Sequence, residues 1–197
     1  MAEVADAQRA AVVDRPQPSP EQQARKRLAL RLIRKLGDPA LRSVALPVTV
    51  FDRYLRNEAK RMGQIMEDAE GIGLAATQLG VMHRLLVYRV EPEAELTALA
   101  NPRIVWQSEH LEAGEEGCLS IPGVHVTVQR PVAVRVVAQD LRGRERTVEA
   151  EGLEARVIQH ELDHLEGVLI IDRITTEQRR EAMRALREAR MAAAEAD

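Results

Sequence analysis

Short hydrophobic runs of β-type residues follow one another through the middle of this 197-residue chain, and no helical pattern separates them. The runs cover residues 85–90, 104–106, 124–128 and 132–137, and the Asp-Leu-Arg-Gly sequence at 140–143 is typical of a turn. Parallel strands need long crossover connections, usually helices, so strands that follow one another without them pair antiparallel. The pattern predicts an α+β fold with antiparallel β-sheets.

Three helices are expected around these strands. The first begins at a capping box formed by Thr49 and Asp52 and ends near Gly71, with apolar residues at three- and four-residue steps. The second covers residues 154–167. The third begins at a capping box at Thr175 and runs to near the end of the chain.

The composition excludes several classes of protein. Aromatic residues make up only 2% of the chain, so the core must be aliphatic and stacking platforms for single-stranded nucleic acid are absent. The formal net charge of −3 argues against direct nucleic-acid binding by the core, and no apolar run is long enough to cross a membrane. Cys118 is the only cysteine, which excludes an internal disulfide and fits a reducing, cytoplasmic location.

The chain divides into three segments. Residues 1–26 are expected to be a flexible N-terminal extension, because prolines alternate with polar residues there and favour an extended chain. Residues 27–174 are expected to form the catalytic domain, and residues 175–197 a C-terminal helix of the same domain.

The segment His160-Glu161-Leu162-Asp163-His164 carries the strongest chemical signal. On a helix, positions i and i+4 share one face, so both imidazoles can bind one metal ion, with Glu161 beside them to accept a proton from water. A catalytic ion usually has three protein ligands and an open position. No histidine follows His164, so the third ligand is either Cys118, upstream, or a glutamate of the last helix such as Glu181.

Cys118 is open to three interpretations: a small buried hydrophobic residue, a nucleophilic thiol, or a metal ligand. The neighbouring acids Glu115 and Glu116 are expected to raise the pKa of its thiol, which disfavours a free thiolate. A bound metal ion removes that difficulty, because it deprotonates a coordinating thiol.

The glycine- and alanine-rich stretch at residues 71–80 lets the backbone approach a ligand closely. It lacks the pattern of a dinucleotide- or phosphate-binding loop. Its informative residue is Gln78, because a buried amide needs a partner and can donate to an oxyanion.

Three motifs occur in a fixed order: Gly-Ile-Gly-Leu-Ala-Ala-Thr-Gln at 71–78, Glu-Gly-Cys-Leu-Ser at 116–120, and Gln-His-Glu-Leu-Asp-His at 159–164. With them, the chain closely resembles the bacterial peptide deformylases over roughly residues 30–175. The resemblance implies antiparallel sheets around the central metal-binding helix, with an N-terminal and a C-terminal helix. It also implies one Fe(II) per chain, which Zn(II), Ni(II) or Co(II) can replace. The implied reaction removes the formyl group from the formyl-methionine of nascent polypeptides and releases formate.

The resemblance also assigns roles to residues of the three motifs. It implies that Cys118, His160 and His164 bind the metal, with water in the fourth position, and that Glu161 is the general base and then the general acid. The residues implied for the oxyanion are Gln78 and the backbone N–H of Leu119. The residues implied for holding the peptide are Ile72, Gly73, Gly117 and Leu119.

Further residues are expected near the substrate. Ile121, Leu153 and Val157 are expected to contribute to an apolar pocket for the methionine side chain. Arg156 lies one turn before His160, so it is expected either to pair with an acid or to hold the substrate backbone.

Other functions stay open at this point. One is a small zinc endopeptidase in which Glu181 completes the metal site, and another is a non-catalytic module with a structural zinc. A third is an inactive relative, against which the presence of Gln78, Cys118 and Glu161 argues.

The last helix carries five arginines and two glutamates within residues 179–190, a local charge of +3. The resemblance implies a possible contact with the ribosome through this helix. The alternative is a solvated charged helix with Met183 and Leu186 packed inward.

Overall fold

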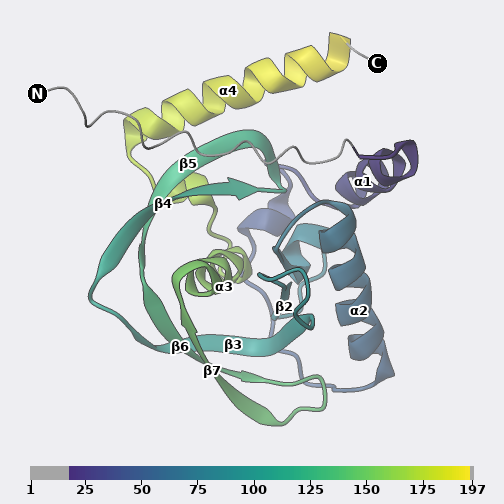
Figure 1. Ribbon diagram of the computed structural model, residues 1–197, viewed down its shortest axis with the longest axis vertical. Coiled ribbons are helices and arrows are strands. Elements are labelled where there is room, and N and C mark those ends of the chain that lie inside the picture. The colour runs from purple at the N-terminus through teal and green to yellow at the C-terminus, as the bar shows by residue number, and fades with distance from the viewer. Residues whose placement is uncertain (1–17, 196–197) are drawn as a thin grey trace, which may run out of the picture.

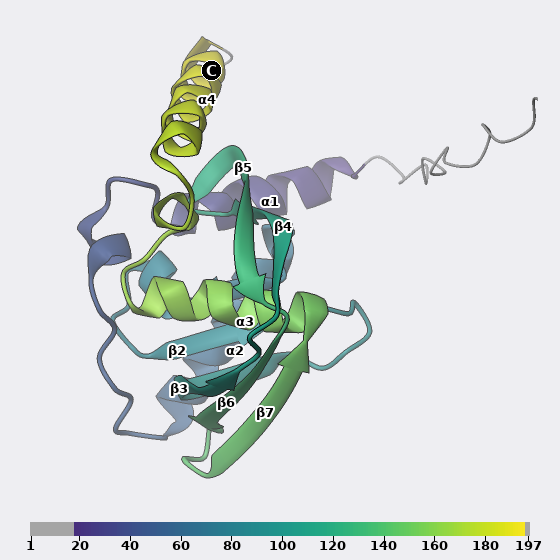
Figure 2. The ribbon, with the colours of Figure 1, turned by 90° about the vertical axis from the view of Figure 1, so that its left-hand side faces the viewer.

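Helix α3 (Gly152–Leu165) runs through the middle of the protein, with β-strands on two sides of it (Figures 1 and 2). The structure is a computed structural model and describes residues 18–195. One sheet has five strands in the order β1-β2-β3-β6-β7 and the other pairs β4 with β5, all antiparallel. The strands are β1 (Gly73–Ala75), β2 (Leu85–Tyr88), β3 (Thr97–Gln107), β4 (Leu111–Cys118), β5 (Ile121–Pro131), β6 (Ala133–Gln139) and β7 (Glu145–Glu151). The predicted α+β fold is confirmed.

Several strands are longer than expected or were not predicted. The runs at 104–106 and 124–128 are only the central parts of β3 and β5. Strands β4 and β7 were missed because glutamates and glycines occupy most of β4 and polar residues most of β7, and only alternate residues of β7 are buried. The turn at residues 140–143 is confirmed, and the Asp140 carboxylate accepts backbone N–H bonds within it.

The N-cap of helix α2 (Arg53–Asp68) lies three residues after the predicted one at Thr49. Its N-cap is Asp52, whose carboxylate accepts the backbone N–H groups of Tyr54 and Leu55, so the capping box from Thr49 was wrong. An acceptor directly at the N-cap satisfies the free N–H groups of the first turn without help from Thr49. The apolar face of α2 packs on β1 and β2.

Helix α1 (Pro20–Leu32) corrects the prediction for the N-terminal extension. Residues 20–26 are helical rather than extended, while residues 1–17 lie outside the described part of the chain. Pro20 is compatible with the helix because it stands in the first turn, where its missing N–H has no helical partner. Ser19 and Gln22 form a capping box in front of it. Helix α1 packs against α2.

Helix α4 (Thr176–Glu195) leaves the body of the molecule and projects from it (Figure 2). The predicted capping box of Thr175 and Gln178 is confirmed. Ala182 and Leu186 are buried in a cluster that includes residues of β5. Within residues 18–195 there are also three short 3₁₀ turns: η1 (Pro39–Arg42), η2 (Ala76–Leu79) and η3 (Ile170–Asp172).

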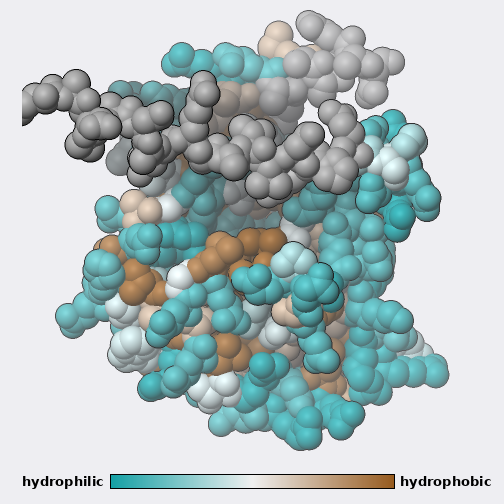
Figure 3. Space-filling model, in the orientation of Figure 1, coloured by the Kyte–Doolittle hydropathy of each residue, from teal (hydrophilic) through white to brown (hydrophobic). Residues whose placement is uncertain are grey.

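The core is aliphatic, as the composition predicted. Of the four aromatic residues only Tyr88 is buried, and Trp106 and Tyr54 are exposed. The surface in the view of Figure 3 is mostly hydrophilic, with hydrophobic residues gathered near the centre of that face. Among the described helices, none combines the length and the apolar character needed to span a bilayer.

Candidate metal centre

Cys118, at the end of β4, faces two histidines from α3. His160 and His164 are one helical turn apart, and their rings meet edge to face with centroids 4.9 Å apart. The Cys118 Sγ atom lies 3.3 Å from His164 Nε2. The ligand atoms of all three residues lie within 4.8 Å of one another. Cys118 is 42 residues before His160 in the sequence, and His160 and His164 are one helical turn apart. The fold brings the three side chains together at one point.

Glu116 holds His160 from the side away from Cys118. The Glu116 Oε2 atom lies 3.0 Å from His160 Nδ1, which leaves Nε2 of that ring for a metal ion. Arg130 contacts the same carboxylate in bidentate fashion at 2.6 and 2.8 Å, and Arg156 Nη1 donates to it at 2.9 Å. Although burial raises the pKa of Glu116, Arg130 and His160 lower it to about 2. Glu116 is therefore a permanent carboxylate that orients the imidazole.

A second carboxylate extends this buried network. Asp163, which is on α3 between the two histidines, accepts from Arg130 Nη1 at 2.9 Å and from Arg173 Nε at 3.0 Å. The Arg130 side chain is only 5% exposed, and two carboxylates compensate its charge. The network therefore fixes α3 against β5.

The expectation for the thiol pKa of Cys118 was wrong. Burial raises this pKa, but His164 and His160 lower it well below its usual range. Glu116 does not oppose the thiolate as expected, because two arginines and His160 surround its carboxylate. Glu115 points to solvent, where it is 75% exposed and pairs with His125.

Glu161 is buried beside the cluster. Its Oε2 atom has no hydrogen-bonding partner among the described residues. Burial raises the pKa of its carboxyl group, while His160 and His164 oppose the rise. Gly73 faces this carboxylate so closely that a Cβ at position 73 would clash with Glu161 and lie 2.9 Å from Val157. A glycine is therefore required at position 73.

Gln78 lies in the 3₁₀ turn η2 and is 1% exposed. The backbone N–H of Ala75 donates to its Oε1 at 2.9 Å, which fixes the direction of the amide. Its Nε2 then lies 3.8 Å from Cys118 Sγ and 3.2 Å from Ser120 Oγ. The amide thus presents its donor group to the metal centre.

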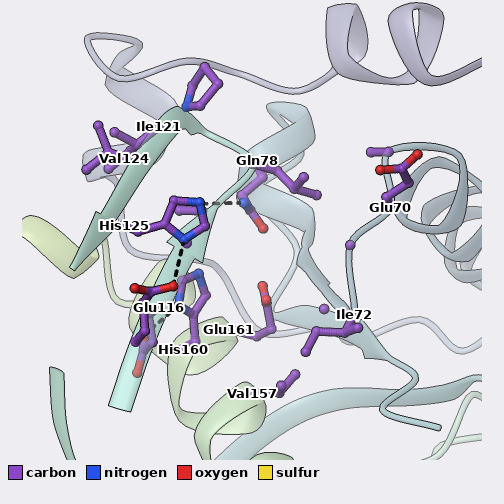
Figure 4. Close-up of a pocket in the computed structure, with 18 of the residues that line it drawn as sticks. Glu70, Ile72, Gln78, Glu116, Ile121, Val124, His125, Val157, His160 and Glu161 are labelled. Carbon is purple, nitrogen blue, oxygen red and sulfur yellow. Dashed lines mark hydrogen bonds and ion pairs between the residues drawn. The ribbon is translucent and has the colours of Figure 1, made fainter. Parts of the chain in front are cut away.

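A cavity of about 540 Å³ opens in front of these residues (Figure 4). Val124 and His125 of β5 lie on one side of it, and Ile72 and Glu70 lie on the other. All the residues expected to hold the peptide line it: Ile72, Gly73, Gly117 and Leu119. The residues expected for the apolar pocket line it as well: Ile121, Leu153 and Val157.

Sequence reasoning missed one wall of this cavity. Lys26 and Leu30, on helix α1, line it together with Glu70, which follows α2. Lys26 and Glu70 form an ion pair across the rim. Glu70 also has a positive φ of 59°, which is uncommon for a residue other than glycine. The weak amphipathic pattern of α1 gave no sign that this segment reaches the site.

Arg130 was also missed, although the sequence holds a signal for it. The buried side chains of β5 alternate through Val124, Val126 and Val128, and Arg130 is the next residue in that inward register. An arginine at an inward position predicts a buried carboxylate partner. For Arg156, the expectation of an acidic partner is met by Glu116.

The three converging residues fit a divalent metal ion. A thiol with a lowered pKa and two imidazoles, one of them fixed through its other nitrogen, form a donor set typical of zinc or iron sites. In the described part of the chain, the metal-binding groups that cluster are Cys118, His160 and His164 alone. Glu181 is exposed on α4 and outside this cluster, so the endopeptidase alternative that relied on it was wrong.

Comparisons with known proteins agree with this geometry. The family model for polypeptide deformylase matches residues 30–180. A peptide deformylase of Parafrankia is 48% identical over 162 residues, which are 82% of this chain and 88% of that protein. The crystal structure of a peptide deformylase from Legionella pneumophila has a TM-score of 0.78 at 39% identity, covering 82% of this chain and 96% of that one. The peptide deformylase of Synechococcus elongatus in complex with actinonin has a TM-score of 0.75 at 43% identity, covering 80% and 86%.

The fold and the site together define a metal-dependent hydrolase with a cysteine–histidine–histidine centre. Its ligand helix lies between two antiparallel sheets. The chain belongs to the peptide deformylase family, the enzymes that remove the formyl group from the N-terminal methionine of nascent polypeptides.

Proposed function

We propose that Cys118, His160 and His164 bind the catalytic metal ion of this deformylase and that Glu161 transfers the proton. The observation that carries this assignment is the convergence of the three side-chain atoms within 4.8 Å, directly beside a buried carboxylate with one oxygen that no described residue hydrogen-bonds. When bound, a divalent cation lowers the pKa of a water molecule towards neutrality and polarises a carbonyl group.

The protein's own groups account for the remaining chemistry. Glu161 accepts the proton of the attacking water as it adds to the formyl carbon, and a raised carboxyl pKa suits a group that must take up and hold this proton. Glu161 returns the proton to the amide nitrogen as the C–N bond breaks, which yields formate and a free amino terminus. The Gln78 amide and the Leu119 backbone N–H donate to the oxyanion.

The substrate is held in front of these groups. Gly73 and Gly117 contact the extended backbone of the formyl-methionyl peptide. The apolar side chains of Ile121, Leu153 and Val157 contact the methionine side chain. We expect the crowded contact between Gly73 and Glu161 to admit a formyl hydrogen and to exclude the methyl of an acetyl group.

We infer Fe(II) as the resident ion, with Zn(II), Ni(II) or Co(II) able to replace it. One thiolate and two imidazoles suit all four ions. Loss of activity in air but not under nitrogen would support iron with a thiolate ligand. A protein purified anaerobically without iron, yet fully active, would contradict it.

The deciding experiment for the proposed function combines metal analysis with formate release from a formyl-Met tripeptide, performed anaerobically. We expect one ion per chain and rapid formate release, and no release from the acetylated tripeptide. The Cys118→Ser variant is expected to lose the ion on dialysis. Equal turnover of both tripeptides, or full metal content in the variant, would contradict the assignment.

We further propose that the enzyme acts on nascent chains in the cytoplasm and contacts the ribosome through α4. The support is the projection of α4 from the body, with Arg180, Arg184 and Arg187 exposed on it (Figure 2). The side chain of Arg190, which the sequence prediction included, lies outside the described residues. Reversing the three exposed arginines to glutamate should abolish co-sedimentation with ribosomes at low salt and leave formate release unchanged. Unaltered co-sedimentation would contradict the contact.

A further inference from the structure

The segment that follows helix α1 contacts both parts of the chain that carry the assigned oxyanion donors. The backbone N–H of Arg34 donates to the carbonyl of Gln78 at 2.7 Å, and the N–H of Leu36 donates to the carbonyl of Ser120 at 2.9 Å. Residues 34–36 thus bridge the 3₁₀ turn η2 and the link between β4 and β5. These two segments are about 40 residues apart in sequence.

Lys35, in the middle of this bridge, makes the contact closest to the reaction. Its Nζ donates to the carbonyl oxygen of Leu119 at 3.0 Å, and this contact is partly buried. Burial lowers the pKa of Lys35, while Cys118 raises it. A lysine is costly to bury without a compensating role, because its ammonium group loses hydration.

The Leu119 carbonyl belongs to the same short link between β4 and β5 as the N–H group assigned to the oxyanion. Leu119 lines the cavity, whereas Lys35 is not among the described residues that do so. Lys35 therefore contacts the loop and does not line the cavity. Its effect on the reaction must pass through the orientation of the loop.

We propose that Lys35 is a positioning residue for the oxyanion site, which it orients by holding the Leu119 carbonyl. This inference rests on the proposed role of the Leu119 N–H. A hydrogen-bond donor stabilises an oxyanion only when it is held in the correct direction before the reaction, and a small displacement costs much of its effect. The charged Lys35 side chain supplies that restraint through its hydrogen bond to the Leu119 carbonyl, and its charge polarises the peptide groups of the loop.

The test replaces Lys35 by Met, which keeps the length and apolar stem of the side chain and removes the donor. We expect kcat for a formyl-Met tripeptide to fall about tenfold, less than the roughly 10²–10³ typical of a lost oxyanion donor, with KM changed less than about twofold. Lys35→Arg should recover most of kcat because it restores a charged donor. Lys60→Met, at an exposed position of α2, is the matched control and should behave as the wild type.

The readouts separate positioning from general support of the fold. Metal content and the unfolding midpoint should stay near wild-type values in Lys35→Met. A wild-type kcat in Lys35→Met would overturn the proposal, as would a loss of kcat that Lys35→Arg does not recover or that tracks a loss of metal.

Gln78→Met distinguishes this proposal from the proposed function on which it rests. If Gln78→Met lowers kcat about 10²-fold while Lys35→Met has no effect, the oxyanion site stands and the role of Lys35 fails. If Gln78→Met also retains wild-type kcat, the oxyanion assignment itself fails.

Discussion

The carboxylate of Glu116 lies 3.0 Å from Nδ1 of His160, and its other oxygen accepts from Arg130 and Arg156. The imidazole donates its Nδ1 proton to a carboxylate that stays ionised, so its second nitrogen is an acceptor for a metal ion. The residue two positions before Cys118 thus orients an imidazole that is 44 residues further along the chain.

Replacing Glu116 by Gln should weaken metal binding about 10- to 100-fold, because the ligand His160 loses its charged partner. Metal retained after dialysis against a graded chelator measures the effect. Glu115→Gln is the matched control, since the Glu115 side chain is 75% exposed and contacts none of the three ligands. Equal metal retention by both variants would show that Glu116 does not tune the site.

Glu161→Gln should keep the metal ion and lose about 10²–10⁴ in kcat, because the amide cannot accept a proton from water. Metal analysis and formate release are measured on the same sample. Glu166→Gln, at the exposed end of the same helix, serves as the control. A Glu161→Gln enzyme with kcat within threefold of the wild type would remove Glu161 from the mechanism.

Gly73→Ala should reduce kcat strongly while the protein still folds, because the added Cβ would displace the Glu161 carboxylate and press on Val157. The unfolding midpoint and the metal content are expected to change less than the turnover. Undiminished formate release would mean that the carboxylate can move aside without cost, contrary to the tight fit described.

Asp172 should stabilise the fold in a pH-dependent manner. Burial raises the pKa of its carboxyl group, but Arg42, the backbone N–H of Leu169 and Arg179 lower it below 3.8. A pKa that is lower in the folded state adds stability above pH 3.8, and this contribution disappears as the pH falls through the folded-state pKa.

The Asp172→Asn variant should therefore unfold about 3 °C below the wild type at pH 7, and the difference should shrink at pH 3 and below. Thermal unfolding followed by circular dichroism at several pH values measures it. Asp68→Asn, at a half-buried position near the end of α2 where, among the described residues, the carboxylate accepts only from Gln64, is the control. A difference that stays constant from pH 7 to pH 3 would assign the stabilisation to packing instead of charge.

The cluster of Cys118, His160 and His164 could be predicted from the sequence because the spacing of the two histidines is a local feature. A His-Glu-x-x-His spacing needs only a helix, and Cys118 is the single thiol of the chain. The wall formed by Lys26 could not be predicted, because its ion pair with Glu70 depends on how α1 packs on α2. Long-range packing of this kind leaves no periodic pattern in the sequence.

The same limit applies to the strands and to the thiol. Strand β4 contains glutamates, which do not fit the hydrophobic pattern of a strand. One of them, Glu116, is nevertheless buried, because it forms ion pairs with arginines of β5 and α3. The prediction for the pKa of Cys118 was wrong for the same reason, because His164 and His160, which lower this pKa, are its neighbours in space and not in sequence.

The position of α1 has a practical consequence for work with this enzyme. Lys26 lies before the segment from residue 30 onwards that matches the family model, yet it borders the cavity in front of the metal centre. Trimming the protein to the shared segment would remove one wall of that cavity. An inhibitor extended to reach Lys26 and Glu70 would instead gain contacts that relatives without such a helix cannot offer, and so would distinguish this enzyme from them.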